Sequence, residues 1–152
     1  MKCIPYSEYA VYNDPKDEFD LFISLDSGDE KRLGKLSELI KTTDTINIDH
    51  HVSNTYFGRM NFVDADASST SELIYRLLYG WGDLDQDIAY ALYAGIVFDT
   101  GCFKHPSTSP YTMQVAGELM AYNIPFTRIQ EQLFYSRSQV EVKLLAAALN
   151  HM

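Results

Sequence analysis

Two apolar runs near the start of the chain predict buried strands with a helix between them. The run from Phe19 to Leu25 (FDLFISL) is short and rich in β-forming residues, which is typical of a strand buried on both faces. A turn at Ser27 to Asp29 leads into Glu30 to Ile40, where leucines recur at helical spacing. Thr45 to Ile48 is typical of a second strand. The order strand, helix, strand predicts a right-handed parallel crossover.

The rest of the chain shows mainly helical patterns. A helix is expected over Ser69 to Leu78, because Ser69 and Glu72 have the spacing of a capping box. Pro110 stands where the first turn of a helix tolerates a proline. Further helices are expected over 85–98, 110–122, 126–135 and 138–150. A strand-rich first half and a helix-rich second half predict an α/β domain with helices covering a parallel sheet.

Composition narrows the class of protein. With 152 residues, 46% of them hydrophobic and 22% charged, the chain has the make-up of one soluble globular domain. It contains no apolar run of membrane-spanning length and does not begin with a signal pattern, so we expect no membrane partner. Cys3 and Cys102 lack the spacing of a disulfide framework, so we expect a reduced, cytoplasmic protein.

The formal net charge of −9 bears on the partners. Proteins that follow long duplex nucleic acid carry clustered lysine and arginine, and this charge points away from them. If the protein handles phosphates, bound metal ions have to supply the positive charge. The simpler reading is that the negative charge only keeps the protein in solution.

Acidic and histidine side chains follow both predicted strands. Asp26 comes directly after the first strand, and Asp49, His50 and His51 come directly after the second. Because ligands of open parallel sheets bind beyond the carboxyl ends of the strands, these side chains are candidate ligands of a divalent metal. Asp26 also suits a turn or helix cap. Adjacent side chains on extended backbone point in opposite directions, so at most one of the two histidines need be a ligand.

Two residues further along have open roles at this point. Asp99 ends the apolar run GIVFD and precedes Thr100 and Gly101, which suits either a helix-ending turn or a third metal ligand. His105 lies six residues beyond Asp99, where a histidine is more often an ordinary loop residue than a functional one.

Four stretches of sequence together resemble the DHH phosphoesterase family. TINIDHHVSN, from Thr45 to Asn54, resembles the motif that gives the family its name. LFISLDSGDEKRLGKL lies upstream of it, and VDADASSTSELIYRLL and AGIVFDTGCFKHPSTSP lie downstream, in the order and spacing of the family. The resemblance covers the chain from Phe19 to Ser138 and implies a parallel-sheet DHH domain with helices on both faces.

The resemblance also implies roles for individual residues. Asp26 and Asp99 would contact two metal ions and His50 would ligate one of them, with Mn²⁺ as the expected ion and Mg²⁺ as the alternative. His51 would act in catalysis and face the substrate phosphate, and His105 would help to bind substrate. Asp49 would orient a histidine, as groups behind metal ligands commonly do.

Within the family, HHVSN and TGCFKHPST look most like the branch of bifunctional oligoribonucleases that also dephosphorylate 3′-phosphoadenosine 5′-phosphate. The implied partners are therefore short RNA oligonucleotides and nucleotide phosphates, with an exonuclease activity on the RNA. Family II pyrophosphatases and cyclic-dinucleotide phosphodiesterases share the same motifs and stay open as alternatives. So does a degenerate DHH module without catalytic activity.

Family members begin with a His-x-x-x-Asp-x-Asp motif after their first strand and carry a C-terminal substrate-binding domain. No histidine precedes His50. We therefore expect residues 1–152 to be a DHH domain that lacks its first strand and its C-terminal partner domain, with negligible activity alone. Loss of a strand leaves a neighbouring edge open, so we expect a homo-oligomer unless Met1 to Tyr12 cover that edge.

Overall fold

A small parallel sheet and a following group of helices form the fold in the computed structural model, which describes residues 4–10, 19–82 and 84–151. This architecture confirms the predicted α/β class. In chain order the elements are η1 (Ser7–Tyr9), β1 (Leu21–Leu25), η2 (Glu30–Lys41), β2 (Asp44–Asp49), β3 (Met60–Val63), α1 (Thr70–Leu78), α2 (Gln86–Asp99), α3 (Pro110–Met120), α4 (Phe126–Gln130), η3 (Glu131–Tyr135) and α5 (Gln139–Leu149).

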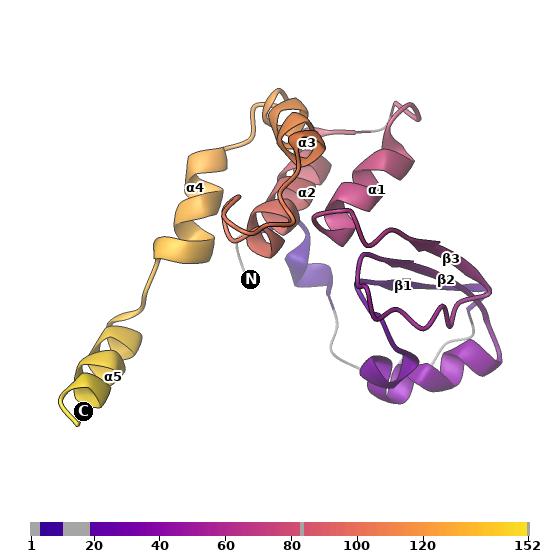
Figure 1. Ribbon diagram of the computed structural model, residues 1–152, viewed down its shortest axis with the longest axis horizontal. Coiled ribbons are helices and arrows are strands. Elements are labelled where there is room, and N and C mark those ends of the chain that lie inside the picture. The colour runs from indigo at the N-terminus through magenta and orange to yellow at the C-terminus, as the bar shows by residue number, and fades with distance from the viewer. Residues whose placement is uncertain (1–3, 11–18, 83, 152) are drawn as a thin grey trace.

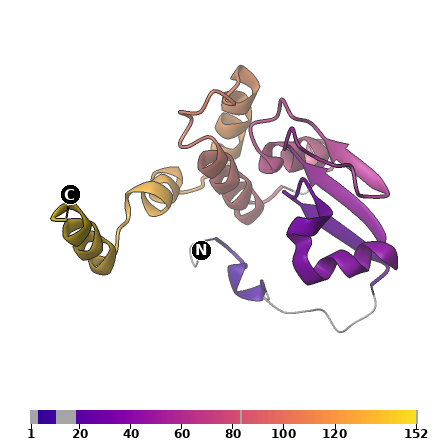
Figure 2. The ribbon, with the colours of Figure 1, turned by 60° about the horizontal axis from the view of Figure 1, so that its bottom comes forward.

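The three strands are parallel and lie in the order β1-β2-β3. β1 and β2 are joined through η2, so the predicted strand, helix, strand unit with parallel pairing is confirmed. Figures 1 and 2 show η2 on one side of the sheet and α1 on the other. β2 is the central strand, and its carboxyl end therefore lies between those of its neighbours.

β3 is a strand that the sequence pattern did not predict. It has only four residues, and the segment that joins it to β2 contains no helix. Parallel strands are usually joined through a helix, so the expected signal for a further parallel strand was missing. The irregular connection, residues 50–59, carries the histidine pair.

β1 is more exposed than predicted. The expected strand was buried on both faces, but Leu21, Ile23 and Leu25 are 45%, 51% and 50% exposed. Ser24, which points to the opposite face, is buried. The prediction was wrong because no described element fully covers this face of β1, which is also an edge strand in the described part of the chain. Its apolar face and its outer edge are both open.

η2 is a tight 3₁₀-type helix rather than the α-helix that the leucine spacing predicts. Gly34 interrupts it with φ 58° and ψ −126°, a conformation that side chains with a Cβ rarely adopt. Leu33 before the break and Leu36 and Leu39 after it are partly buried, and none of the residues of η2 is fully buried. Asp29 caps the N-terminus of η2, because its side chain accepts a hydrogen bond from the backbone N–H of Lys31.

The apolar core lies among the helices rather than on the sheet. Its buried members come from α1, α2, α3 and α4 and include Tyr75, Leu92, Ile96, Leu119 and Ile129. α1 and α2 approach closely at Gly95, where a Cβ atom would lie 2.0 Å from the Ser71 hydroxyl oxygen. This close contact fixes α2 against α1 and brings the C-terminal end of α2 to the sheet.

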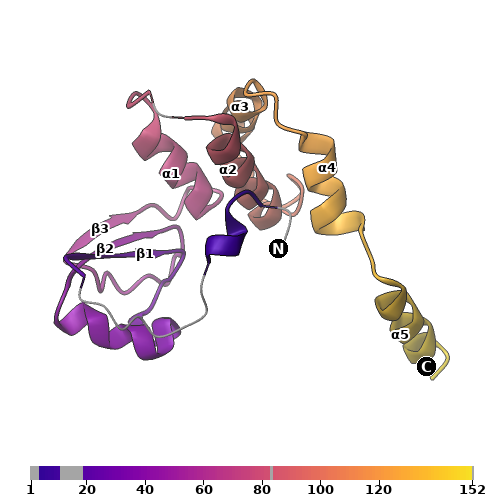
Figure 3. The same ribbon diagram turned by 180° about the vertical axis from the view of Figure 1, so that it is seen from behind.

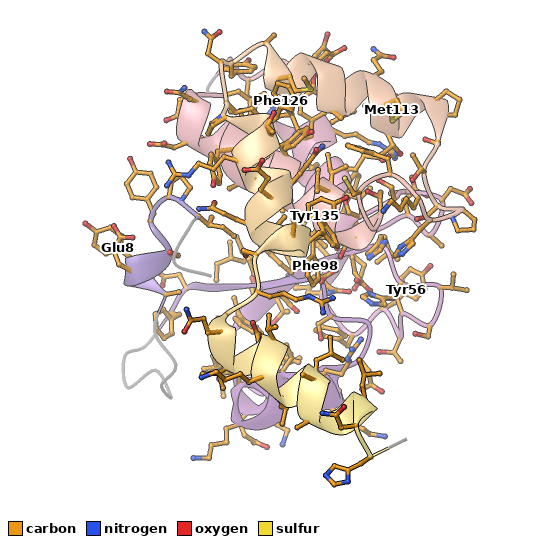
Figure 4. All side chains as sticks on the ribbon, turned by 90° about the vertical axis from the view of Figure 1, so that its left-hand side faces the viewer. Glu8, Tyr56, Phe98, Met113, Phe126 and Tyr135 are labelled. Atoms are coloured by element: carbon orange, nitrogen blue, oxygen red, sulfur yellow. The ribbon has the colours of Figure 1, made fainter. Side chains whose placement is uncertain are left out.

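The C-terminal helices continue the predicted pattern with one difference. The helix expected over 126–135 consists of α4 followed by one turn of π-helix, η3. Phe134 of η3 stacks on Phe98 of α2 with ring centroids 6.4 Å apart. Phe98 and Tyr135, the last residue of η3, are labelled in Figure 4. α5 extends away from the other elements, and none of its residues is buried in the described chain (Figures 1 and 3). No helix among the described residues has the length and apolar character to span a membrane.

The described part of the N-terminal segment lies at α2. Tyr6 hydrogen-bonds to Asp87 in the first turn of α2, and the negative charge of Asp87 raises the pKa of the Tyr6 hydroxyl. Residues 1–3 and 11–12 of the segment that was expected to cover the sheet edge lie outside the described residues. Association through that edge therefore stays a prediction.

We predict that the chain self-associates through β1 and that Ile23→Lys weakens this association, because a charge on an edge strand opposes strand pairing. Size-exclusion chromatography with light scattering over a range of concentrations measures it. Met113→Lys is the matched control, since Met113 is 52% exposed on α3 and Ile23 is 51% exposed. Equal association of the two variants would show that β1 is not the contact.

Candidate metal centre

Side chains from three elements meet beyond the carboxyl ends of the strands. Asp26 follows β1, His50 and His51 follow β2, and Asp99 is the last residue of α2. Asp26, His50 and His51 each offer one ligand atom, and these atoms all lie within 4.8 Å of one another. The side chains that the sequence placed at the two strand ends are therefore brought together, and α2 adds Asp99.

His50 presents one ring nitrogen to two carboxylates. Its Nε2 atom lies 3.6 Å from Asp26 Oδ1 and 3.8 Å from Asp99 Oδ2. Its Nδ1 atom lies 3.3 Å from the carbonyl oxygen of Ala67, to which an Nδ1–H donates. This tautomer leaves the lone pair of Nε2 facing the carboxylates.

The spacing and the donor set fit a divalent ion. Two ligands about 2.1 Å from one ion and at right angles to it are about 3 Å apart, so an ion at His50 requires only small movements of Asp26 and Asp99. Carboxylates alone suit Mg²⁺ or Mn²⁺, and an imidazole in the set favours a transition metal.

Asp26 is held in place through its backbone and its side chain. Its backbone has φ 59°, in the left-handed region that aspartate tolerates better than most residues. Its N–H donates to the carbonyl oxygen of Ile48 on β2, at 3.0 Å. The Thr70 hydroxyl, in the first turn of α1, donates to Asp26 Oδ1 at 2.8 Å. β2 and α1 thus fix the carboxylate from two sides.

Asp99 has a raised pKa. Burial is the main cause, the negative charge of Asp26 adds to it, and the imidazoles of His50, His51 and His105 oppose it. Two carboxyl groups that face one point repel each other when both are ionised. A cation between Asp26 and Asp99 would relieve this repulsion and keep both ionised.

Asp49 is a fully buried carboxylate that holds His51. Its Oδ1 atom accepts a hydrogen bond from His51 Nδ1 at 2.6 Å, and its Oδ2 atom accepts one from Asn54 Nδ2 at 2.6 Å. Burial raises the pKa of Asp49, but the bonds from His51 and Asn54 outweigh this effect and leave the pKa below its usual range. His51 therefore has its Nδ1 atom engaged, and no described residue hydrogen-bonds to its Nε2 atom.

The two histidines do not point in opposite directions. Their ring centroids are 4.8 Å apart, and both rings belong to the same cluster. The alternation expected for extended backbone does not apply, because β2 ends at Asp49 and the histidines lie in the following irregular segment. The proposed difference in their roles stays a prediction.

Two residues of the site were not singled out by the sequence. Asn54 joins Asp49 to Asn47, with its Nδ2 atom 2.8 Å from Asn47 Oδ1. Thr70 orients Asp26. Asn54 ends the HHVSN motif, so the sequence could have indicated it as a site residue. The contact between Thr70 and Asp26 spans 44 positions in the sequence, and no local pattern indicates it.

His105 lies beside Asp99 but outside the cluster of three ligand atoms. Its Nδ1–H donates to the carbonyl oxygen of Asp99 at 2.9 Å, and the side chain is exposed. The ring lies against Gly101, where a Cβ atom would be 2.4 Å from Nε2. Gly101 also has φ 56°, a backbone conformation that residues with a Cβ atom rarely adopt. Substrate binding by His105 stays a prediction.

Comparison with known proteins agrees with this arrangement. The model of the DHH family, N-terminal domain, matches residues 2–96. The bifunctional oligoribonuclease and PAP phosphatase NrnA of Bacillus subtilis is 38% identical over 121 residues, which are 76% of this chain and 36% of the relative. The protein of the same name from Thermus thermophilus is 31% identical over 138 residues, which are 88% of this chain and 41% of the relative.

Solved structures show the same fold. An exopolyphosphatase-related protein from Bacteroides fragilis matches 88% of this chain and 41% of its own, with a TM-score of 0.80 and 28% identity. A putative family II inorganic pyrophosphatase from Methanococcus jannaschii matches 74% of this chain and 40% of its own, with a TM-score of 0.61 and 21% identity, a likeness of fold alone. With a family model that matches most of the sequence and includes Asp26 and both histidines, the chain belongs to the DHH family.

Proposed function

We propose that the protein is a cytoplasmic, metal-dependent phosphoesterase and that Asp26, His50 and Asp99 hold Mn²⁺, with Mg²⁺ as the alternative ion. The observation that carries the proposal is the position of His50 Nε2, which faces both carboxylates while Nδ1 is engaged by a backbone carbonyl. A bound divalent ion supplies the positive charge that a protein of net charge −9 needs to hold a phosphate, and it activates water for attack on phosphorus.

The proposed substrates are short RNA oligonucleotides and 3′-phosphoadenosine 5′-phosphate. The names of the Bacillus subtilis and Thermus thermophilus relatives support this choice, as does the HHVSN string. The chain spans 36% and 41% of the length of these relatives. We therefore assign the substrates to the complete protein and not to residues 1–152 alone.

His51 and Asp49 act as a pair in this proposal. Because Asp49 accepts the Nδ1–H of His51, the ring has a fixed orientation and its Nε2 atom is left for the substrate phosphate. Asn54 donates a hydrogen bond to Asp49 Oδ2, so both oxygens of the carboxylate are held in place. His51 is the catalytic residue, and Asp49 is a positioning residue that acts through it.

The described ligands are enough for one ion with open positions. Asp26, His50 and Asp99 supply three side chains, as in catalytic sites that keep a place for water or substrate. We propose that a second ion requires ligands in addition to these three side chains. Residues 1–152 alone then have negligible phosphoesterase activity.

We predict that His50→Ala weakens Mn²⁺ binding, whereas His51→Ala leaves binding intact and mainly lowers turnover. The physical reason is that His50 Nε2 faces both carboxylates, while His51 is bonded to Asp49. Calorimetric titration of the complete protein with Mn²⁺ measures the affinities. Equal loss of affinity in the two variants contradicts the separate roles.

Asp49→Asn should lower the free energy of unfolding at pH 7 by about 1–3 kcal/mol, because an amide cannot accept both hydrogen bonds. The folded-state pKa of Asp49 is lowered, so this stabilisation is fully present above the unfolded pKa of about 3.9 and is lost as pH falls toward the folded pKa. Urea unfolding of the wild type and the variant should therefore converge in acid.

Asp44→Asn is the control for this experiment. Asp44 forms an exposed ion pair with Arg59, and such pairs contribute at most about 1 kcal/mol. A difference between wild type and Asp49→Asn that stays constant from pH 7 down into acid would show that the charge of Asp49 is not what stabilises the site.

The complete protein with Mn²⁺ should hydrolyse both di- to pentanucleotide RNA and 3′-phosphoadenosine 5′-phosphate. Gel analysis of the RNA and release of phosphate from the nucleotide are measured together, with residues 1–152 as a parallel sample. The 152-residue chain should be more than about tenfold slower, a barrier difference above about 1.4 kcal/mol. Pyrophosphate cleaved far faster than either substrate would assign the protein to the pyrophosphatases instead.

A further inference from the structure

Glu72 is a fully buried carboxylate close to the candidate centre, and the roles assigned so far do not include it. The sequence predicts that it closes a capping box with Ser69. Half of that prediction is confirmed, since the Ser69 hydroxyl accepts the backbone N–H of Glu72 at 3.1 Å. The other half is wrong, because the Glu72 side chain turns inward to Ser68 and does not return to the N–H of Ser69.

Four donors converge on the Glu72 carboxylate. Its Oε2 atom accepts hydrogen bonds from the Ser68 hydroxyl at 2.7 Å, the Ser68 N–H at 3.3 Å and the Thr112 hydroxyl at 2.7 Å. Its Oε1 atom accepts one from Arg76 at 2.7 Å. A buried charge costs free energy unless it is paired and hydrogen-bonded, and this one is fully satisfied. A cap on a helix requires no such set of partners.

The peptide bond between Ala67 and Ser68 links Glu72 to His50. The N–H of this peptide donates to Glu72 Oε2, and its carbonyl oxygen accepts from His50 Nδ1 at 3.3 Å. The structure has only trans peptides among its described residues, and in a trans peptide the N–H and C=O point in opposite directions. Glu72 and His50 therefore hold the two sides of one rigid plane.

The same carboxylate also fixes the segments around that plane. Arg76 bonds to Glu72 and to Asp64, whose side chain accepts the N–H of Asp66 at 3.0 Å in the turn before Ala67. Thr112, in the first turn of α3, ties Glu72 to the helix that follows the His105 loop. The Ala67 carbonyl thus has little freedom to turn away from His50.

We propose that Glu72 is a positioning residue that selects the Nδ1–H tautomer of His50 through the Ala67–Ser68 peptide and so leaves His50 Nε2 free for a metal ion. A carboxylate on the N–H side polarises the peptide and makes its carbonyl a better acceptor for the imidazole N–H. The metal part of this inference rests on the proposed function. The tautomer part does not, because it concerns only groups within the chain.

Glu72→Gln tests the proposal in the 152-residue chain. The substitution keeps the volume but leaves one acceptor oxygen where four donors converge. Long-range proton–nitrogen NMR of the imidazoles at about pH 8.5, where histidine is neutral, reports the tautomer of His50 directly. We expect the Nδ1–H form to dominate in the wild type and to lose that dominance in Glu72→Gln. Titration with MnCl₂ should show about tenfold weaker binding, the effect typical of groups behind a ligand.

Glu118→Gln is the matched control. Glu118 on α3 accepts a hydrogen bond from Tyr75 on α1, so it also joins these two helices, but it does not touch the Ala67–Ser68 peptide. Its substitution should leave the His50 signals unchanged. A folded Glu72→Gln with an unchanged His50 tautomer overturns the proposal, and so does an equal change in Glu118→Gln.

Glu72→Asp covers the case in which Glu72→Gln does not fold. It keeps the negative charge but draws the carboxylate away from the Ser68 N–H, which donates to Glu72 Oε2 at 3.3 Å. A smaller shift of the His50 tautomer in the same direction supports the proposal, and no shift overturns it. If the wild type shows the Nδ1–H tautomer but does not bind Mn²⁺, the proposed one-ion site of Asp26, His50 and Asp99 fails while the role of Glu72 stands.

Discussion

The repulsion between two carboxylates that face one imidazole nitrogen is the constraint on which this site depends. Asp26 and Asp99 come from different elements, and each lies within 3.8 Å of His50 Nε2. Without a cation, burial of Asp99 and the negative charge of Asp26 both favour the protonated form of Asp99, and its pKa is raised. The surrounding fold holds both groups in place against that repulsion. Gly95 allows α2 to reach the sheet, and Thr70 fixes Asp26.

Both histidines have their Nδ1 atom held by a hydrogen bond, but the acceptors differ. His51 donates its Nδ1–H directly to the buried carboxylate of Asp49, whereas His50 donates to a peptide carbonyl whose other side faces the buried carboxylate of Glu72. In each case a negative charge out of contact with water determines which nitrogen carries the proton. His51 has a negatively charged carboxylate as its direct hydrogen-bond acceptor. A peptide in between gives His50 the orientation without a third charge beside Asp26 and Asp99.

The sequence was sufficient to place Asp26 and the two histidines close together, because the relevant information is local. An aspartate or a histidine pair directly after a parallel strand must lie at one edge of the sheet, whatever the rest of the fold. Neither β3 nor the buried role of Glu72 could be predicted from local sequence patterns. β3 has no helix before it, and Glu72 looks like a capping residue until its contact with Thr112, 40 positions away, is known. The exposure of β1 depends on what covers a sheet, which a strand pattern does not contain.

The buried face of β2 is polar, and its apolar face is only partly covered. Thr45, Asn47 and Asp49 are buried, while Ile46 and Ile48, which face the other way, are only partly covered. The inner face is therefore polar, and it is stable because Asn54 and Ser27 satisfy Asn47 through hydrogen bonds. The apolar face continues onto β1 through Ile23, which pairs with Ile46. A second chain that covered this apolar face would remove hydrophobic surface from water without contacting the ligands, because the ligands lie at the carboxyl edge of the sheet.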